Sequence, residues 1–444
     1  MRRMLALSFV LALAAPAAGA APHLTLYSQD LGFVREPRTL EVGGARDTVR
    51  LTGIPTGIDV SSVRLVPEGG AQVTRLAYRF DVASGDELLE RAIGQRVRVT
   101  MRGDRVTEGM LVASDGTWLM VRTDDGSVVT LARAALEEIR LAQPPRNLSL
   151  RPSLEVVLEG AKGRVPAELS YLTSGLSWSA EHTLVRQGET GATWSTMVQV
   201  ENTTGVEFRD AVLKLVAGDP RRGRATPPPM PVMRTMAMAD QAVEMKAGFA
   251  EETFSEYHLY TLGRPATLRD RERQSLAMID PHKIQVTPRY LVRPGMNSVV
   301  AQLEIVNSDA RGLGMPLPGG RVRFFEKDPQ GDLQFTGETT IGHTAEGEKA
   351  TLEMGTAFDL ATERRQVSDK RISDREREMQ VEIKLRNRKK TDVTIVVEES
   401  VPGEWEILQK THEPERKDSN TMRFTIPVKA GQEVVIRYTA RVRY

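Results

Sequence analysis

Apolar and polar residues alternate one by one through much of the chain, and this pattern restricts the fold more than any other feature. Apolar side chains stand at every second position in residues 165–171, again in residues 178–184 apart from His182, and most regularly in residues 434–442. A period of two with one polar face is typical of antiparallel strands that are buried on one side and wet on the other. No rhythm of strands and long helices accompanies it, so a parallel α/β sheet is not indicated.

We therefore predict an all-β protein of tandem antiparallel β-sandwich-like domains with a small SH3- or Sm-like barrel insert. Residues 22–80 hold short strand patterns separated by Gly- and Pro-containing turns, as in a small N-terminal β domain. In residues 81–143 a short helical pattern precedes strands joined by Asp-Gly turns, as in a small barrel. Pro144 and Pro145 mark a linker, and residues 147–444 are expected to form a large β-sandwich region.

The first residues have the three parts of a signal peptide. Arg2 and Arg3 precede an apolar run over residues 4–15, and small residues follow at 18–20. We expect cleavage after about Ala20 and a periplasmic or secreted protein. No later run is long and apolar enough for a transmembrane helix, so the mature chain is expected to have no transmembrane segment. The chain has no cysteine, so disulfides cannot stabilise it after export.

Charge and aromatic content argue against a nucleic-acid partner. Lys and Arg number 60 and Asp and Glu number 59, and aromatic residues make up only 5% of the chain. Nucleic-acid-binding proteins usually present a basic surface, often with stacking aromatics. The strands of the predicted barrel have no basic-aromatic face, so we interpret the barrel as a spacer and not as a nucleic-acid or peptide binder.

No catalytic motif or cofactor site is recognisable. The chain has no G-x-S-x-G, no H-E-x-x-H and no P-loop, and its six histidines are scattered. His182 shares one strand face with Trp178 and Leu184, which favours a packing role over a catalytic one. Whether His182, His258 and His343 meet in space cannot be read from the sequence. Glu338 and Asp210 are the weak candidates for a carboxylate pair of the kind glycosidases use, although a surface or turn role is favoured for both.

Residues 219–252 are rich in Pro, Ala and Met and fit neither the helical nor the strand period, which predicts a mobile loop or crossover. Its methionines supply the weak metal-ligand candidates, since thioethers are soft ligands for Cu(I). These candidates are Met230, Met233, Met236 and Met238. The alternative is that the methionines form an adaptable segment that contacts a partner.

Several segments resemble one bacterial family of exported proteins of unknown function, related to the mucoidy inhibitor A-like proteins. The resemblance covers roughly residues 165–443. It is carried by YLTSGLSWSAEHTLV, VENTTGVEFRDAVLKLVAGD, FSEYHLYTLGRPATL, LQFTGETTIGHTAEGEKATLEMGTAFDLATERRQ and EIKLRNRKKTDVTIVV. It implies a small N-terminal β domain, no known catalytic residues and an effect on mucoid exopolysaccharide. Relatives of the mucoidy inhibitor type have a long helical coiled coil, from which residues 81–143 depart.

From these observations we expect a non-enzymatic envelope protein that binds a protein or glycan partner through strand edges and the 219–252 loop. The alternative is a hydrolase acting on envelope polysaccharide, with a site assembled across sheets. A third hypothesis is Cu(I) handling by the methionines. A deep pocket with paired acids of raised pKa would favour the hydrolase.

Overall fold

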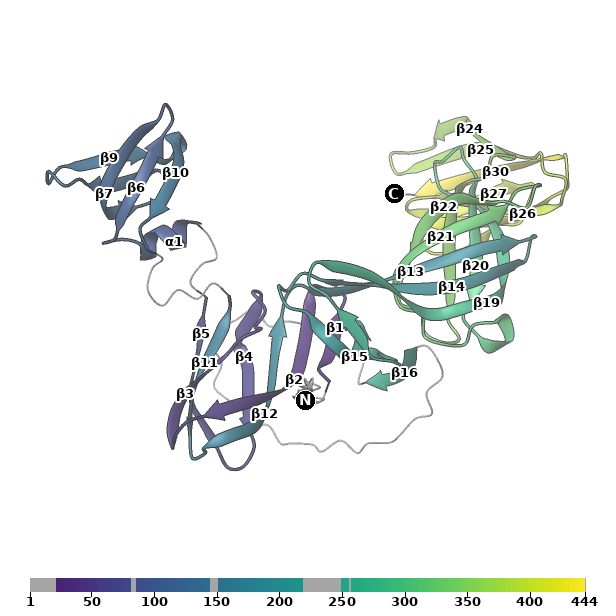
Figure 1. The fold of residues 1–444 in the computed structure, drawn as a ribbon. Helices are drawn as coiled ribbons and strands as arrows, with labels where there is room; N and C mark the ends of the chain where they lie inside the picture. Colours follow the sequence, from purple (N-terminus) through teal and green to yellow (C-terminus); the bar gives the residue numbers. More distant parts are fainter. Residues whose placement is uncertain (1–20, 81–84, 144–150, 219–248, 255–256, 444) are drawn as a thin grey trace, which may run out of the picture.

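The computed structural model describes residues 21–80, 85–143, 151–218, 249–254 and 257–443, which consist almost entirely of β-strands (Figure 1). The predicted all-β, sandwich-like fold is confirmed. The expected signal peptide (1–20) and most of the predicted 219–252 loop, including its four candidate methionines, lie outside the described residues. No helix in the described part of the chain is both long and apolar enough to cross a membrane.

An N-terminal sandwich is built from two sheets that face each other across one core. The strands of the larger sheet are β1 (His23–Tyr27), β2 (Leu31–Val42), β4 (Ile58–Pro67), β12 (Gly163–Thr173), β15 (Phe208–Ala217), β16 (Phe249–Phe254), β17 (Tyr257–Leu262) and β18 (Ala266–Leu268). Their order is β16-β17-β15-β1-β2-β12-β4, with β18 paired to β15. The smaller sheet has the order β3-β11-β5, from β3 (Arg46–Leu51), β5 (Gln72–Arg79) and β11 (Ser153–Glu159).

Strands from residues 22–80 pair directly with strands from the second half of the chain. Strand β1 lies parallel to β15, and β12 lies antiparallel between β2 and β4. In the smaller sheet β11 fills the place between β3 and β5. The two sheets therefore combine strands from both sides of the predicted boundaries at residues 80 and 147.

The insert between β5 and β11 is a separate small β unit. It consists of α1 (Gly85–Arg91), β6 (Arg96–Met101), β7 (Arg105–Ser114), β8 (Trp118–Arg122), β9 (Val128–Ala132), the 3-10 helix η1 (Arg133–Ala135) and β10 (Leu136–Leu141). The strand order is β10-β6-β7-β8-β9. Gly103 and Asp104, with φ of 82° and 57°, make the tight turn between β6 and β7 that the Gly-Asp sequence indicates. Leu111, Leu119 and Val121 lie in a core that belongs to the insert alone.

A ten-stranded sheet carries the chain from the N-terminal sandwich to its C-terminal end. Its strands are β13 (Leu176–Gln187), β14 (Gly191–Asn202), β19 (Glu272–Val292), β20 (Val300–Val306), β21 (Gly320–Lys327), β22 (Leu333–Ile341), β23 (Lys349–Thr356), β26 (Val393–Ser400), β28 (Glu415–Arg416) and β29 (Thr421–Val428). We call β13, β14 and β19–β23 the middle unit; the 3-10 helix η2 (Asp309–Arg311) lies in its β20–β21 connection. Its core is continuous with that of the N-terminal sandwich and includes Trp194 and Phe324.

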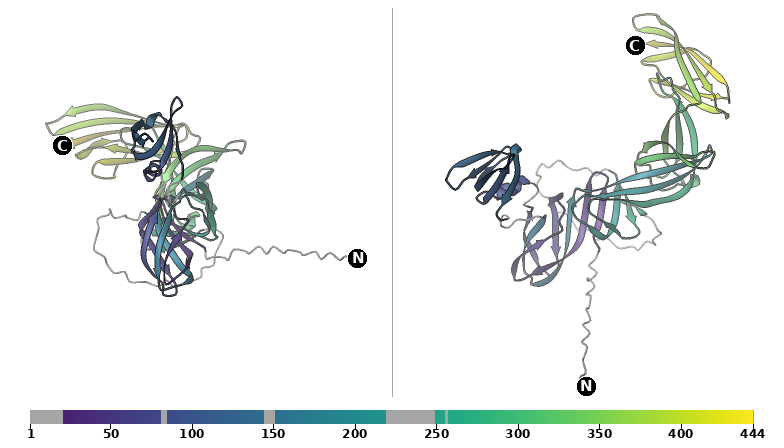
Figure 2. Two further views of the ribbon diagram at one scale, coloured as in Figure 1. Left: turned by 60° about the vertical axis from the view of Figure 1, so that its left-hand side comes forward. Right: turned by 45° about the horizontal axis from the view of Figure 1, so that its top comes forward.

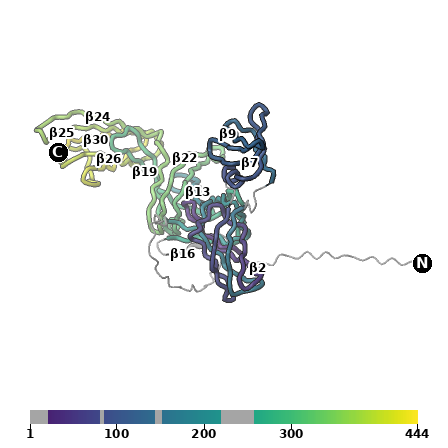
Figure 3. Tube along the Cα trace, turned by 90° about the vertical axis from the view of Figure 1, so that its left-hand side faces the viewer, coloured from purple at the N-terminus to yellow at the C-terminus, as the bar shows by residue number. Residues whose placement is uncertain are grey.

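The long strand β19 links the middle unit to a C-terminal sandwich. The first part of β19 pairs with β14, and its last residues pair with β20 and with β26. There β26 and β29 share a core with a four-stranded sheet of order β24-β25-β30-β27, and β28 is a short exposed strand beside β29. Those strands are β24 (Leu360–Arg371), β25 (Glu376–Asn387), β27 (Glu404–Lys410) and β30 (Glu433–Arg443). The N-terminal sandwich, middle unit and C-terminal sandwich follow one another along an extended molecule, as Figures 2 and 3 show.

Gly320 sets how closely β21 can approach β13. The two strands pair in parallel with Gly320 opposite Ala180, and a Cβ at Gly320 would lie only 2.2 Å from the Ala180 carbonyl oxygen. We expect Gly320→Ala to lower the free energy of unfolding by about 2 kcal/mol, because the added methyl group forces the strands apart. The midpoint of urea unfolding measures the effect.

Gly342→Ala is the matched control, since nothing lies within 4 Å of a Cβ built at Gly342. We expect its free energy of unfolding to differ from that of the wild type by less than about 0.5 kcal/mol, so that the urea midpoint stays close to that of the wild type. Equal midpoints for the two variants would show that the close approach at Gly320 does not limit stability.

Candidate functional site

A polar pocket of about 480 Å³ lies where the N-terminal sandwich meets the outer face of the middle unit. Alternation on β13 explains its composition, because Trp178, Ala180 and His182 are buried while the intervening side chains face outward. The residues that line the pocket are Ser28, Ser177, Trp178, Ser179, Glu181, Gln199, Glu201, Arg273, Arg321 and Arg323. Ser28 belongs to the turn between β1 and β2, so the N-terminal sandwich contributes one side of the pocket.

Cross-strand ion pairs organise the charges of the polar pocket. Arg273 Nη2 lies 2.7 Å from Glu201 Oε2, and Arg323 Nη1 lies 2.9 Å from Glu181 Oε2. Glu338 on β22 stands 3.5 Å from Arg323 Nε and 3.7 Å from Arg321 Nη1, at the edge of the same array. Each arginine therefore has a carboxylate neighbour on an adjacent strand, which limits the rotamers of both side chains.

Three serine hydroxyls in the polar pocket have no bonding partner in the described part of the protein. They belong to Ser28, Ser177 and Ser179. Each hydroxyl can both donate and accept a hydrogen bond. The pocket thus presents free hydroxyls beside guanidinium donors and carboxylate acceptors, an arrangement suited to binding a polar molecule.

His182 lies on the opposite face of β13 and is buried. Its Nε2 lies 3.0 Å from the Pro318 carbonyl oxygen, so Nε2 carries the proton and donates, and Nδ1 accepts from the Thr196 hydroxyl at 2.8 Å. Its ring packs against that of Trp194 with 4.9 Å between centroids. Burial lowers the pKa of His182 to about 4, against which the Pro318 hydrogen bond acts weakly. His182 is therefore a neutral structural residue, the role that its strand pattern favoured.

His343 bonds to Gly319, which directly follows Pro318, the hydrogen-bond partner of His182. His343 Nδ1 accepts a hydrogen bond from the Gly319 N–H at 2.9 Å, and Tyr260 on β17 donates to the Pro316 carbonyl at 3.1 Å. Burial lowers the pKa of His343, and the charge of His258 lowers it further. The three histidines thus gather around the segment before β21. Within the described ranges, however, no group of three or more His, Cys, Asp or Glu side chains could hold a metal ion.

The carboxylate candidates Glu338 and Asp210 lie in different sheets and have separate partners. Glu338 is an exposed member of the ion-pair array, whereas Asp210 lies at an irregularity of β15 with φ of 49° and contacts Thr267. Wherever the pKa of a described Asp or Glu is shifted, it is lowered; in Glu382 the first cause is the hydrogen bond from Arg437. None of these shifted carboxyls has the raised pKa of a general acid.

A buried polar cluster in the C-terminal sandwich has no counterpart in the sequence predictions. Glu399 on β26 is 2% exposed, accepts from Tyr438 Oη at 2.6 Å and lies 2.9 Å from Arg364 Nε. Burial, and then the Glu399 charge, raise the pKa of Tyr438, so its hydroxyl stays protonated and donates. The cluster joins three strands across the two sheets. The sequence signal was a charged residue on the apolar face of β26, in phase with Ile395 and Val397.

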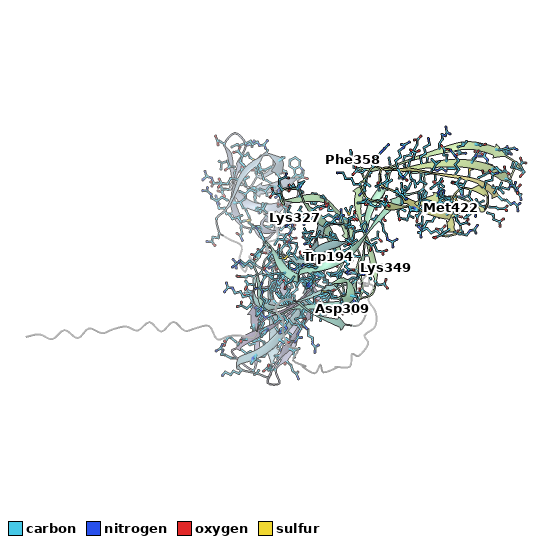
Figure 4. All side chains as sticks on the ribbon, turned by 90° about the vertical axis from the view of Figure 1, so that its right-hand side faces the viewer. Trp194, Asp309, Lys327, Lys349, Phe358 and Met422 are labelled. Carbon is cyan, nitrogen blue, oxygen red and sulfur yellow. The ribbon has the colours of Figure 1, made fainter. Side chains whose placement is uncertain are left out.

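A second cavity, of about 230 Å³, lies between β20, β23 and the first turn of the C-terminal sandwich, and we call it the junction groove. Its side chains include Arg186, Tyr290, Phe358, Asp359 and Lys389. Figure 4 shows Phe358 where the middle unit meets the C-terminal sandwich, whereas Trp194 and Met422 lie within the two units. Phe358 is 98% exposed, and no sequence pattern marked it.

The cations of the junction groove are weakly neutralised. Lys389 Nζ lies 2.8 Å from Tyr290 Oη and 4.8 Å from the centre of that ring. Arg186 Nη1 is 3.5 Å from Glu326 Oε2, and its buried Nε has no hydrogen-bond partner within the described chain. The groove therefore combines an exposed aromatic ring with two cations that could receive a carboxylate.

Comparison with known proteins identifies the larger part of the chain. The profile of DUF4139, a domain of unknown function, matches residues 167–444. The chain belongs to the DUF4139 family. The DUF4139 region begins within β12 and contains the whole middle unit and C-terminal sandwich, and hence both the junction groove and every residue of the polar pocket except Ser28. No curated protein matches the chain.

The buried His182 makes the stability of the DUF4139 region depend on pH. The unfolded chain binds a proton at His182 below its usual pKa of 6.5, but the folded chain does so only below about 4. Its contribution is therefore complete above pH 6.5 and is lost as the pH falls from 6.5 to 4, by up to about 3 kcal/mol. We expect His182→Gln to be less stable at pH 7 and to show a correspondingly flatter pH dependence in urea unfolding.

His412→Gln is the control, because His412 is a partly exposed residue beside Thr411 in the C-terminal sandwich. This variant keeps the buried His182, so the loss of stability between pH 6.5 and 4 should persist in it. If the free energy of unfolding of His182→Gln fell with decreasing pH as steeply as that of the wild type, the assignment of His182 as a buried neutral imidazole would be contradicted.

Proposed function

We propose that this protein is a non-enzymatic binding module of the cell envelope that holds a protein partner at the junction groove. The observation that carries the proposal is the position of Phe358, a large apolar side chain that is 98% exposed beside a cavity. Single exposed apolar residues are common on protein surfaces. Phe358 differs from them because the same cavity also presents Arg186, Tyr290 and Lys389.

An aromatic anchor of this kind contributes much of the affinity of an interface. Full burial of a phenylalanine side chain is worth about 2 to 3 kcal/mol, and a few such residues dominate the binding energy of many complexes. Phe358 is fixed by its backbone neighbours, since Ala357 N–H bonds to the Val299 carbonyl and Arg388 N–H to the Asp359 carbonyl. Little conformational entropy of this backbone is therefore lost when a partner covers the ring.

The charge of the junction groove indicates which partner it fits. Asp359 is the one acidic residue among the described residues that line the groove, and Glu326, the ion-pair neighbour of Arg186, lies outside the lining. An acidic peptide segment would place a carboxylate against these cations and an apolar side chain against Phe358. Because the bulky ring and the cations occur together, we assign the groove to an acidic segment of a protein and not to a glycan.

The envelope location in this proposal comes from the N-terminal signal pattern and from the resemblance to mucoidy inhibitor A-like proteins. Both are predictions from sequence, as is the cleavage after about Ala20. Cu(I) handling by Met230, Met233, Met236 and Met238 also stays a prediction, since these residues lie outside the described part of the chain. The hydrolase alternative gains no support from the lowered pKa values of the described carboxyls.

A photo-crosslinking residue at position 358 tests the proposal in living cells. With benzoylphenylalanine in place of Phe358, we expect one discrete protein adduct. The added substitution Lys389→Glu should reduce its yield at least fivefold, because a carboxylate would then repel the acidic partner. Phe358→Ser should weaken binding of the identified partner at least tenfold while shifting the stability by less than about 0.5 kcal/mol.

Val128 on the insert is the control position, being 53% exposed and remote in sequence from the groove. The crosslinker at 128 should not capture the same protein. A protein adduct that survives Lys389→Glu unchanged, or adducts to glycan alone at position 358, would overturn the proposed function.

A further inference from the structure

The polar pocket between the N-terminal sandwich and the middle unit is separate from the junction groove. It lies on the outer face of β13 and β14, and its lining includes Ser28, Glu181, Glu201, Arg273 and Arg323. We propose that it is a binding site for a neutral, polyhydroxylated ligand, namely a sugar unit of an uncharged glycan.

The balance of charge favours a neutral ligand over an anion. Arg273 is paired with Glu201, Arg323 with Glu181, and Glu338 stands between Arg321 and Arg323. The pocket lining itself holds three arginines and two glutamates, and Glu338 at its edge brings the array of ion pairs to zero net charge. No excess charge is then left to attract phosphate, sulfate or a uronic acid. An anion would also have to compete with a carboxylate already in place at each arginine.

The mixture of donors and acceptors matches the chemistry of sugar hydroxyls. A hydroxyl group donates one hydrogen bond and accepts others, so neighbouring hydroxyls of a sugar can bond to a guanidinium and to a carboxylate at once. The ion pairs Arg323–Glu181 and Arg273–Glu201 offer both kinds of group on adjacent strands. Ser28, Ser177 and Ser179 add hydroxyls that the described chain leaves without partners.

The surroundings of the pocket keep these groups in place. Ser177 is opposite Glu201 and Ser179 is opposite Gln199 in the β13–β14 ladder, and the buried residues between them belong to a core shared with the N-terminal sandwich. At the junction itself a Cβ on Gly32 would lie 2.5 Å from Leu176 Cδ1, which shows how closely β2 and β13 pack. A preorganised site loses little entropy when a weakly held sugar binds.

Cross-strand ion pairs are common on exposed sheets and by themselves indicate only a hydrated surface. The polar pocket differs because the β1–β2 turn makes the surface concave, and because an outward-facing carboxylate on β13 is incompletely bonded. Glu181 Oε2 is buried without a hydrogen-bond partner in the described structure, since its contact with Arg323 is an ion pair without hydrogen-bond geometry. Concavity with incompletely bonded polar atoms is the property of a ligand site.

Ligand-observed saturation-transfer NMR with the full-length protein tests the inference. The probes are the neutral oligosaccharides cellohexaose, maltohexaose and mannohexaose, with oligogalacturonate and inorganic sulfate as anionic probes. We expect at least one neutral oligosaccharide to bind, with an affinity that changes less than twofold between 50 and 300 mM salt, since no net charge is neutralised. Ser179→Trp, which fills the pocket from an exposed position, should weaken that binding at least tenfold.

Thr193→Trp is the matched control, because Thr193 lies on the outward face of β14 but does not line the pocket. It should bind the sugar as the wild type does. Phe358→Ser should also leave sugar binding unchanged, which separates this inference from the function proposed for the junction groove. Failure of all three neutral oligosaccharides to bind, binding of the anionic probes alone, or binding that survives Ser179→Trp would overturn it.

Discussion

The register of β13 is the constraint on which most of this structure depends. His182 fixes it, because the two ring nitrogens bond to Thr196 on the neighbouring strand β14 and to the Pro318 carbonyl just before β21. Strand β13 pairs with both of those strands and packs one face into the core shared with the N-terminal sandwich. A slip of one residue would exchange its two faces. It would bury Ser177, Ser179 and Glu181 and expose Trp178.

The strands were predictable because their signal is local. A period of two over residues 178–184 or 434–442 identifies a strand with one buried face. The dipeptide Gly103-Asp104 similarly indicates the tight turn between β6 and β7. Partner choice is not local. The pairing of β1 with β15 joins residues nearly 190 positions apart, and nothing in the period of either strand specifies the other. For that reason residues 22–80 look like a small domain in sequence but share both sheets with later strands.

The functional surfaces were less predictable than the strands, for two physical reasons. Outward polar residues on β13 and β14 indicate only a hydrated face, and the polar pocket exists because the turn at Ser28 approaches that face. Phe358 stands in a connection without periodicity, where an apolar residue could equally have been buried. By contrast, Glu399 interrupts an apolar face and could have been noticed, although its partners Arg364 and Tyr438 come from strands 35 and 39 residues away.

The place of the insert has a consequence for how this architecture can change. Strands β5 and β11 are direct neighbours, with Arg79 opposite Ser153, so the chain leaves and re-enters the N-terminal sandwich at adjacent points. The strands of the insert pair only with one another among the described strands, and their core is their own. The insert thus lies in the connection between two paired strands. A short loop or another folded module could take its place, and every pair of hydrogen-bonded strands in the sandwich would be kept. A helical hairpin would meet the same geometric requirement as this five-stranded unit, since both return the chain to the point where it left the sandwich.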